Sequence, residues 1–184
     1  KGKKPPARPS DTLCEPGQTS ARFSLQSMST QSNYFCCGYH VPDINHADVP
    51  AVDVMAHVLG CGDSSRLEQA LKQKQQLAHR IYAYAYTPHD PGLVIIDGTS
   101  ADKQTAKLFE GVQTEIAKMQ NELITTSELA NAKLNIHSSS IYEQETVGGH
   151  AGKLAYYLST AGTHNFEEKY YQALREVSTA DVQR

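Results

Sequence analysis

Hydrophobic and polar residues alternate along several short segments in the first part of the chain, a pattern typical of half-buried β-strands. The segments that carry this pattern, or a near-continuous apolar run, are residues 21–29, 34–41, 79–87 and 93–98. The turn-forming sequence Pro-His-Asp-Pro-Gly at 88–92 separates the last two segments, so they are expected to form a hairpin. Together the segments predict a mixed, mostly antiparallel sheet.

Apolar residues recur every three to four positions elsewhere, which predicts amphipathic helices. The expected apolar faces are Val52, Met55, Ala56 and Leu59; Leu67, Ala70 and Leu71; Leu108, Val112, Ile116, Met119 and Leu123; Leu129, Ala132 and Ile136; Leu154, Ala155, Leu158 and Ala161; and Tyr170, Ala173 and Leu174. The expected fold class is therefore α/β (α+β), a two-layer sandwich with helices packed on one face of the sheet.

Capping signals predict where these helices begin. Asp48 precedes the first helix, Pro50 lies in its first turn, and Gly60 with Gly62 closes it. The spacing of a capping box occurs three times, in the pairs Thr125 with Glu128, Asn165 with Glu168, and Ser178 with Asp181. The sequence Val-Gly-Gly at 147–149 is expected to interrupt the helical region.

The composition is that of an ordinary α/β protein, with 39% hydrophobic residues, 20% charged residues and a formal charge of −3. The one basic run, residues 1–8, is interleaved with prolines and has no aromatic residues, so no nucleic-acid partner is expected. No stretch approaches the roughly 20 apolar residues of a membrane span. Residues 1–19 are interpreted as a linker of a longer protein, and the compartment stays open between periplasm and cytoplasm.

Histidines and cysteines are the candidate metal ligands in this sequence. His164 begins a sequence close to the zinc motif H-x-x-E-H, but Glu168 stands where the second histidine should be. His40, Asp43 and His46 lie three residues apart, with His57 on the following helix, and are interpreted as solvated residues. The cysteines form no C-x-x-C pair, and disulfides stay open for Cys14, Cys36, Cys37 and Cys61. No metal site is expected.

Two further groups have a functional and a structural interpretation. Ser64, Ser65 and Arg66 follow Gly62 and form either an anion-binding helix start or an ordinary N-cap. Tyr82, Tyr84 and Tyr86 share one side of a predicted strand. They form either a substrate-facing wall or a row packed under helices or half-exposed.

Several segments resemble one known family when they are taken with their spacing. They are Gly-Tyr-His-Val-Pro at 38–42, Val-Leu-Gly-x-Gly-x-Ser-Ser-Arg-Leu at 58–67, Leu-Ala at 77–78, Asp-Pro-Gly at 90–92, Thr-Thr-Ser-Glu-Leu at 125–129, and residues 177–182. They cover about residues 15–184 and resemble the insulinase/pitrilysin-type zinc metallopeptidases, the inverzincins.

The resemblance implies the second domain of such an enzyme, the one that follows the zinc-bearing domain and lacks the metal. Residues 20–184 would form this non-catalytic domain, incomplete at its C-terminus, with zinc held by the missing catalytic domain. The implied fold is that of the mitochondrial processing peptidase. The implied role is to wall a chamber, contact a peptide or small protein substrate, and pack against the zinc-bearing domain.

Lys72 and His79 occupy positions where the resemblance implies a substrate-contacting arginine and, seven residues later, a tyrosine. Lysine lacks the forked donors of arginine and histidine is shorter than tyrosine, so these contacts are expected to come from another half or subunit. Substrate contacts in this chain are therefore assigned to Lys72, His79, Tyr82 and Tyr84 only as candidates.

Two functions remain in different classes. One is the non-catalytic domain of a zinc-dependent metalloendopeptidase, and the alternative is a structural or assembly protein of the same fold without peptidase activity. A preceding H-x-x-E-H motif in the parent gene would distinguish them. In both, an unpaired sheet edge and uncovered apolar surface predict a homo- or heterodimer.

Overall fold

The computed structural model describes residues 17–101 and 104–184, and the chain divides into two units, Lys1–Thr30 and Gln31–Arg184. In the first unit, the described residues 17–30 contain no strand, and Phe23 and Leu25 are 88% and 85% exposed. The strand predicted for 21–29 is therefore wrong. Alternation of two apolar residues does not make a strand unless a neighbouring strand accepts its hydrogen bonds. Most of the predicted linker, residues 1–16, lies outside the described residues.

The second unit contains a three-stranded antiparallel sheet in the order β1-β3-β2. Its strands are β1 (Asn33–Val41), β2 (Arg80–Tyr86) and β3 (Gly92–Ser100). The predicted hairpin is confirmed, because β2 and β3 pair with Tyr84 opposite Ile95. β1 pairs with the other side of β3, with Cys36 opposite Asp97, so the chain's first strand is not adjacent to the next strand in sequence.

Helix α1 (Val49–Gly60) covers one face of this sheet. Pro50 lies in its first turn, where a missing N–H costs no hydrogen bond, and Val54 and Leu59 are buried. Gly60 lies against β2, and a Cβ at this position would collide with the backbone of Ala83. Glycine is therefore required here by close approach rather than by backbone conformation.

The alternation along β2 decides which side chains this packing buries. Ile81 and Ala83 are 4% and 3% exposed and join the core with Ile96 of β3. Successive side chains point to opposite faces, so the three tyrosines of β2 lie on the other face. The apolar face of the sheet is thus supplied by small and branched residues, which allow α1 to approach closely.

Two helices close the end of the sheet near α1. The segment Glu68–Lys74 (η1) is a π-helix, and α2 (Thr105–Asn121) packs against it. Leu108, Val112 and Met119 of α2 are buried as predicted, whereas Leu123 lies beyond the helix end and is exposed. Ile124 takes its place in the core.

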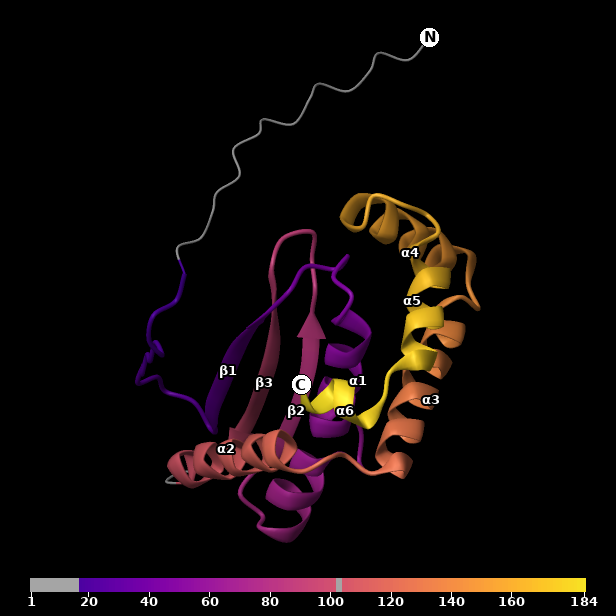
Figure 1. The fold of residues 1–184 in the computed structure, drawn as a ribbon. Helices are drawn as coiled ribbons and strands as arrows, with labels where there is room; N and C mark the ends of the chain where they lie inside the picture. Colours follow the sequence, from indigo (N-terminus) through magenta and orange to yellow (C-terminus); the bar gives the residue numbers. More distant parts are fainter. Residues whose placement is uncertain (1–16, 102–103) are drawn as a thin grey trace. The chain divides into compact units, whose positions relative to one another are not determined.

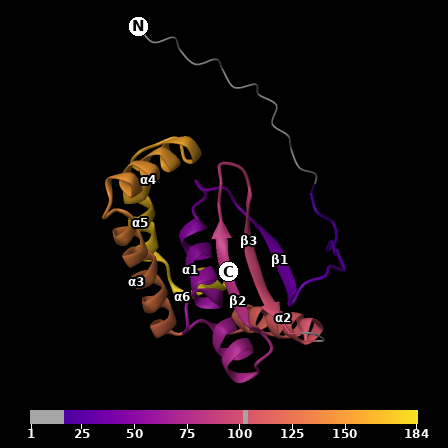
Figure 2. The ribbon, with the colours of Figure 1, turned by 180° about the vertical axis from the view of Figure 1, so that it is seen from behind.

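A helical arm lies on the opposite side of α1 from the sheet (Figures 1 and 2). It comprises α3 (Thr126–Glu143), α4 (Val147–Thr160) and α5 (Phe166–Glu176), followed by α6 (Thr179–Gln183). The interruption predicted at 147–149 lies instead at 144–146, because Thr146 accepts a hydrogen bond from the Gly149 N–H and starts α4. The fold class predicted from sequence is confirmed, a small antiparallel sheet with helices.

Two of the three predicted capping boxes are formed, at Thr125 and Ser178, where the backbone is extended as a cap requires. The box predicted at Asn165 with Glu168 is wrong. Asn165 has φ −90° and ψ 10°, so its side chain makes no capping bond, and its N–H donates instead to the hydroxyl of Thr163. The helix still begins at the predicted place.

A bidentate ion pair joins two segments that lie 62 residues apart. Arg66 donates from Nε to Oε1 of Glu128 at 2.7 Å and from an Nη to Oε2 at 3.0 Å. Oε2 of Glu128 also accepts the Thr125 N–H at 2.7 Å, so one carboxylate both caps α3 and fixes the loop before η1. The hydrogen bonds from Arg66, followed by those from Thr125, hold the pKa of Glu128 at about 2, against an ordinary value of 4.5, although burial opposes this shift.

This ion pair predicts a pH-dependent contribution to stability. Because the folded pKa is lowered, the contribution is complete above about pH 4.5 and is lost as the pH falls towards 2. Glu128→Gln should lower the free energy of unfolding by about 1 to 2 kcal/mol at pH 7, a value reduced for solvent screening. The measurement is urea denaturation at pH 7 and pH 2.5.

Glu110→Gln is the matched control, because Glu110 is exposed on α2. It should change stability by less than about 0.5 kcal/mol at either pH. An equal loss in both variants, or a Glu128→Gln deficit that persists unchanged at pH 2.5, would contradict the assigned role of the ion pair.

Candidate functional site

The tyrosines of β2 lie on the face of the sheet opposite α1. The rings of Tyr82 and Tyr84 stack with centroids 5.8 Å apart, and the guanidinium of Arg80 lies 5.0 Å from the Tyr82 centroid. Tyr84 and Tyr86 are 42% and 54% exposed. Of the two structural interpretations, the row is half-exposed rather than packed under the described helices, and its role as a substrate-facing wall stays a prediction.

The strand register extends this surface across the sheet. Leu93, Ile95 and Asp97 of β3 lie opposite the three tyrosines, and exposed Cys36 and His40 of β1 lie beyond them. We call this surface the open sheet face and define it by Tyr82, Tyr84, Tyr86, Leu93, Ile95, Asp97, Cys36 and His40. It combines aromatic rings, aliphatic side chains and one carboxylate.

Lys72 and His79 take separate roles beside this surface. Lys72 Nζ lies 2.7 Å from Oε1 of Glu68, one turn earlier on η1. His79 is exposed just before β2, and its backbone N–H donates to the Thr99 carbonyl at 2.8 Å. Lys72 is thus paired on its own helix, and the two residues stay candidates for substrate contact.

The loop of Ser64, Ser65 and Arg66 lies between α1 and η1. Arg66 is engaged with Glu128, as described above. Ser65 is buried, and within the described residues its hydroxyl has no hydrogen-bond partner, so it does not act as an N-cap. The pair with Glu128 uses two of the five N–H donors of the Arg66 guanidinium and neutralises its charge.

The arrangement of donor side chains decides whether the described residues can bind a metal ion. Across residues 17–101 and 104–184, no group of three or more His, Cys, Asp or Glu residues is arranged to hold a metal ion. A zinc ion therefore does not fit the donor set of the described chain, since zinc needs at least three converging protein ligands. In the same residues, no helix is long and apolar enough to cross a membrane.

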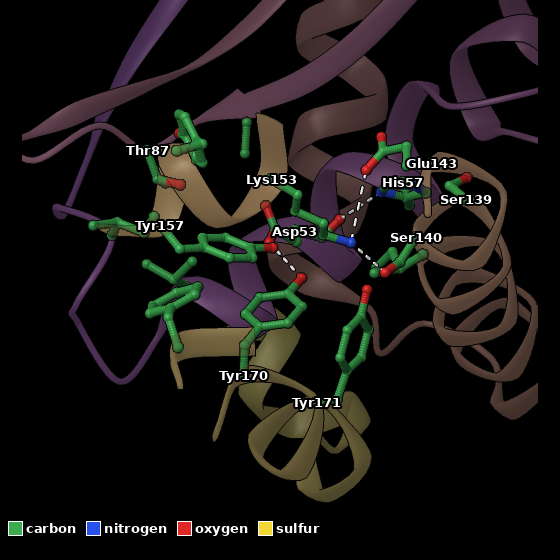
Figure 3. Close-up of a pocket in the computed structure, with 16 residues that line it drawn as sticks. Asp53, His57, Thr87, Ser139, Ser140, Glu143, Lys153, Tyr157, Tyr170 and Tyr171 are labelled. Carbon is green, nitrogen blue, oxygen red and sulfur yellow. Dashed lines mark hydrogen bonds and ion pairs between the residues drawn. The ribbon is translucent and has the colours of Figure 1, made fainter. Parts of the chain in front are cut away.

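A cavity of about 260 Å³ lies between α1 and the helical arm, partly open to solvent (Figure 3). Aromatic rings from α4 and α5 form much of its wall, with Tyr157 and Tyr170 beside Asp53 of α1. The Tyr157 ring packs on Phe166 at 4.9 Å, and Tyr170 packs edge-on against Tyr171 at 5.3 Å. The cavity is therefore a partly aromatic chamber with an acidic group in its wall.

Asp53 is the most perturbed acid of this cavity. Its Oδ2 accepts a hydrogen bond from the Tyr170 hydroxyl at 2.6 Å. Burial raises the pKa of Asp53 from 3.8 to about 6, although the bond from Tyr170 opposes the rise. Burial also lowers the pKa of His57, so the histidine one turn along α1 is held neutral.

The cation of the cavity wall is already neutralised. Lys153 of α4 lies 2.7 Å from Oε1 of Glu167, bonds the Ser140 hydroxyl, and lies 3.7 Å from Glu143. Ser140 also donates to Glu167 at 2.9 Å. These contacts tie α3, α4 and α5 together.

Sequence reasoning missed this cavity. The sequence patterns did not single out Asp53, and its partner Tyr170 lies 117 residues later. An acidic residue flanked by Val52 and Val54 on a buried helix was the one available signal.

Comparison with known proteins assigns the chain to a family. The structure defines a two-layer α/β domain, and its described residues contain no metal-binding cluster. Residues 1–136 match the family model described as the peptidase M16 inactive domain. The chain belongs to this family, which confirms the resemblance to the insulinase/pitrilysin-type zinc metallopeptidases.

Two curated relatives carry the name zinc protease. The chain is 26% identical over 153 residues to the uncharacterized zinc protease YmxG of Bacillus subtilis, covering 83% of this chain and 37% of that protein. It is 28% identical over 154 residues to the zinc protease PqqE of Helicobacter pylori, covering 83% and 35%. The chain thus spans about a third of the length of the curated relatives it matches.

Solved structures share the fold. A protease from Helicobacter pylori superimposes with a TM-score of 0.79 at 24% identity, over 86% of this chain and 38% of that chain. An inactive peptidase domain from Bordetella parapertussis gives 0.75 at 17% identity, over 88% and 87%. The second structure matches this chain over nearly its whole length.

The raised pKa of Asp53 predicts that its charge costs stability. Because the pKa of Asp53 is raised in the folded protein, ionisation of this carboxyl lowers the free energy of unfolding as the pH rises from 3.8 through about 6. Asp53→Asn keeps an acceptor for Tyr170 and removes the charge, so it should raise the free energy of unfolding by about 2 kcal/mol at pH 7.5. At pH 4 the two proteins should differ by less than about 0.5 kcal/mol.

Chemical denaturation at the two pH values measures this difference. A loss of stability on Asp53→Asn at pH 7.5 would show that the ionised form is favoured in the folded protein, contrary to the prediction.

Proposed function

We propose that the chain is the non-catalytic domain of a zinc-dependent metalloendopeptidase, and that its open sheet face contacts an extended peptide within the enzyme's chamber. The observation that carries the proposal is the row of Tyr82, Tyr84 and Tyr86 on a sheet face that none of the helices in the described residues covers. Membership of the peptidase M16 inactive domain family supports the enzyme class. The names of the curated relatives support zinc as the metal of the parent.

Stacked tyrosines suit an unfolded peptide because they combine large apolar area with polar hydroxyls. A tyrosine loses little conformational freedom on binding, and it accepts both apolar side chains and backbone groups. Asp97 lies opposite Tyr82 in the register and adds one acceptor. The open sheet face can therefore bind peptides of varied sequence without recognising each of their side chains.

The chemistry of hydrolysis is assigned to other parts of the assembly. Zinc would be bound by a preceding domain, which packs against this one, and a second subunit or half would complete the chamber. The second half would also supply the substrate contacts of the arginine and tyrosine whose positions Lys72 and His79 occupy in this chain. The alternative, a structural protein without peptidase activity, uses the same packing and lacks peptide binding at the tyrosines.

Substitution of Tyr84 tests the peptide-binding role. Fluorescein-labelled β-casein, an unfolded protein, should bind the chain. Tyr84→Ser should raise the dissociation constant about fivefold, or ~1 kcal/mol, because one stacked ring is lost. Fluorescence anisotropy at pH 7.5 measures the affinity. Lys72→Ala should leave it unchanged within about twofold.

Tyr142→Ser is the matched control, since Tyr142 is 70% exposed near the end of α3 rather than on the sheet. It should bind as the unsubstituted chain does. Equal weakening in both variants, or no detectable binding of casein by any of the proteins, would contradict the proposal and favour the structural alternative.

A further inference from the structure

The cavity between α1 and the helical arm contains a half-buried carboxyl group, Asp53, that no cation of the described residues pairs with. Asp53 accepts one hydrogen bond, from Tyr170, and across the described residues no lysine, arginine or histidine forms an ion pair with it. Lys153, which lines the same cavity, is held by Glu167. An ionised carboxylate in such a site is costly unless an opposite charge accompanies it.

The remaining walls are suited to a cation. Tyr156, Tyr157, Phe166, Tyr170 and Tyr171 line the cavity, and their faces carry the negative end of the ring quadrupole. A carboxylate beside aromatic faces attracts an organic cation from two directions, by charge and by cation–π contact. The cavity volume of about 260 Å³ is several times the ~30 Å³ that one molecule occupies in liquid water.

We propose that this cavity binds an organic cation, the guanidinium or alkylammonium group of a basic side chain, through Asp53 and the surrounding aromatic rings. The site is distinct from the open sheet face, and the inference does not depend on the proposed function. A divalent metal does not suit it, because the cavity offers no cluster of three donor side chains and its rings are not metal ligands.

The other charged groups around Asp53 leave this charge unopposed. On α1, burial lowers the pKa of His57 and so favours its neutral form. Glu143 of α3 and Glu167 of α5 are negative, and Lys153 of α4 contacts both. Three carboxylates therefore face one ammonium when Asp53 is ionised, and a bound monocation brings the cluster closer to neutrality.

Binding should depend on pH through Asp53. Its pKa of about 6 means that the cation competes with a proton. Affinity should be full above pH 7 and about tenfold lower at pH 5, where roughly one tenth of the carboxyl is ionised. The Glu167 carboxyl does not supply this change, since burial raises its pKa but the bonds from Lys153 and Ser140 outweigh burial and leave the pKa lowered.

Calorimetric titration with N-acetyl-arginine amide and N-acetyl-lysine amide tests the site in the 184-residue chain. N-acetyl-citrulline amide, which has the shape of the arginine derivative without its charge, is the neutral probe. We expect one or both cations to bind at pH 7.5, the citrulline derivative to bind at least about tenfold more weakly, and the stronger cation to identify the preferred head group.

Asp53→Asn should weaken binding of the preferred cation at least about tenfold, because the charged partner is lost while the cavity keeps its shape. Asp63→Asn, in the exposed loop after α1, is the matched control and should bind as the unsubstituted chain does. Circular dichroism verifies that both variants are folded. No binding of either cation, equal binding of citrulline, or unchanged binding by Asp53→Asn would each overturn the proposal.

Discussion

Close packing of α1 on β2 is the contact on which the rest of this structure depends. Gly60 permits the approach, because any side chain there would strike the backbone of Ala83. Ile81 and Ala83 are thereby buried, and the strict alternation of β2 sends its tyrosines to the opposite face. One contact thus determines both the apolar core and the exposed aromatic surface to which we assign peptide binding.

The helical arm is attached to this core by polar as well as apolar contacts. Arg66 and Glu128 tie the start of α3 to the loop after α1, and Asp53 and Tyr170 tie α5 to α1. The two links differ in energetics. The Glu128 carboxylate is paired with a guanidinium, whereas the half-buried Asp53 carboxyl bonds a phenol and forms no ion pair within the described part of the chain. An uncompensated charge that lowers stability is a feature more often found at binding sites than in structural cores.

Local patterns in the sequence predicted most of the secondary structure, and long-range geometry explains what they missed. The hairpin of β2 and β3 and the caps at Thr125 and Ser178 are set by residues a few positions apart. The strand at 21–29 failed because pairing is not a local property. The pair of Arg66 and Glu128 lay within two motifs singled out beforehand, yet nothing in the spacing of 62 residues showed that they meet. The Asp53 cavity draws on four helices and had no local signal beyond one acid among valines.

The central claim, that an uncovered tyrosine row contacts peptide, is tested most directly by nitration of tyrosines with tetranitromethane, read by peptide mass mapping. We expect Tyr84 and Tyr86 to be nitrated in the free chain and to be protected when unfolded casein is bound. Tyr142 of α3, which is 70% exposed and lies off the sheet, should react with casein present or absent. Nitration of Tyr84 and Tyr86 that is unaffected by casein, or absent in the free chain, would contradict the account.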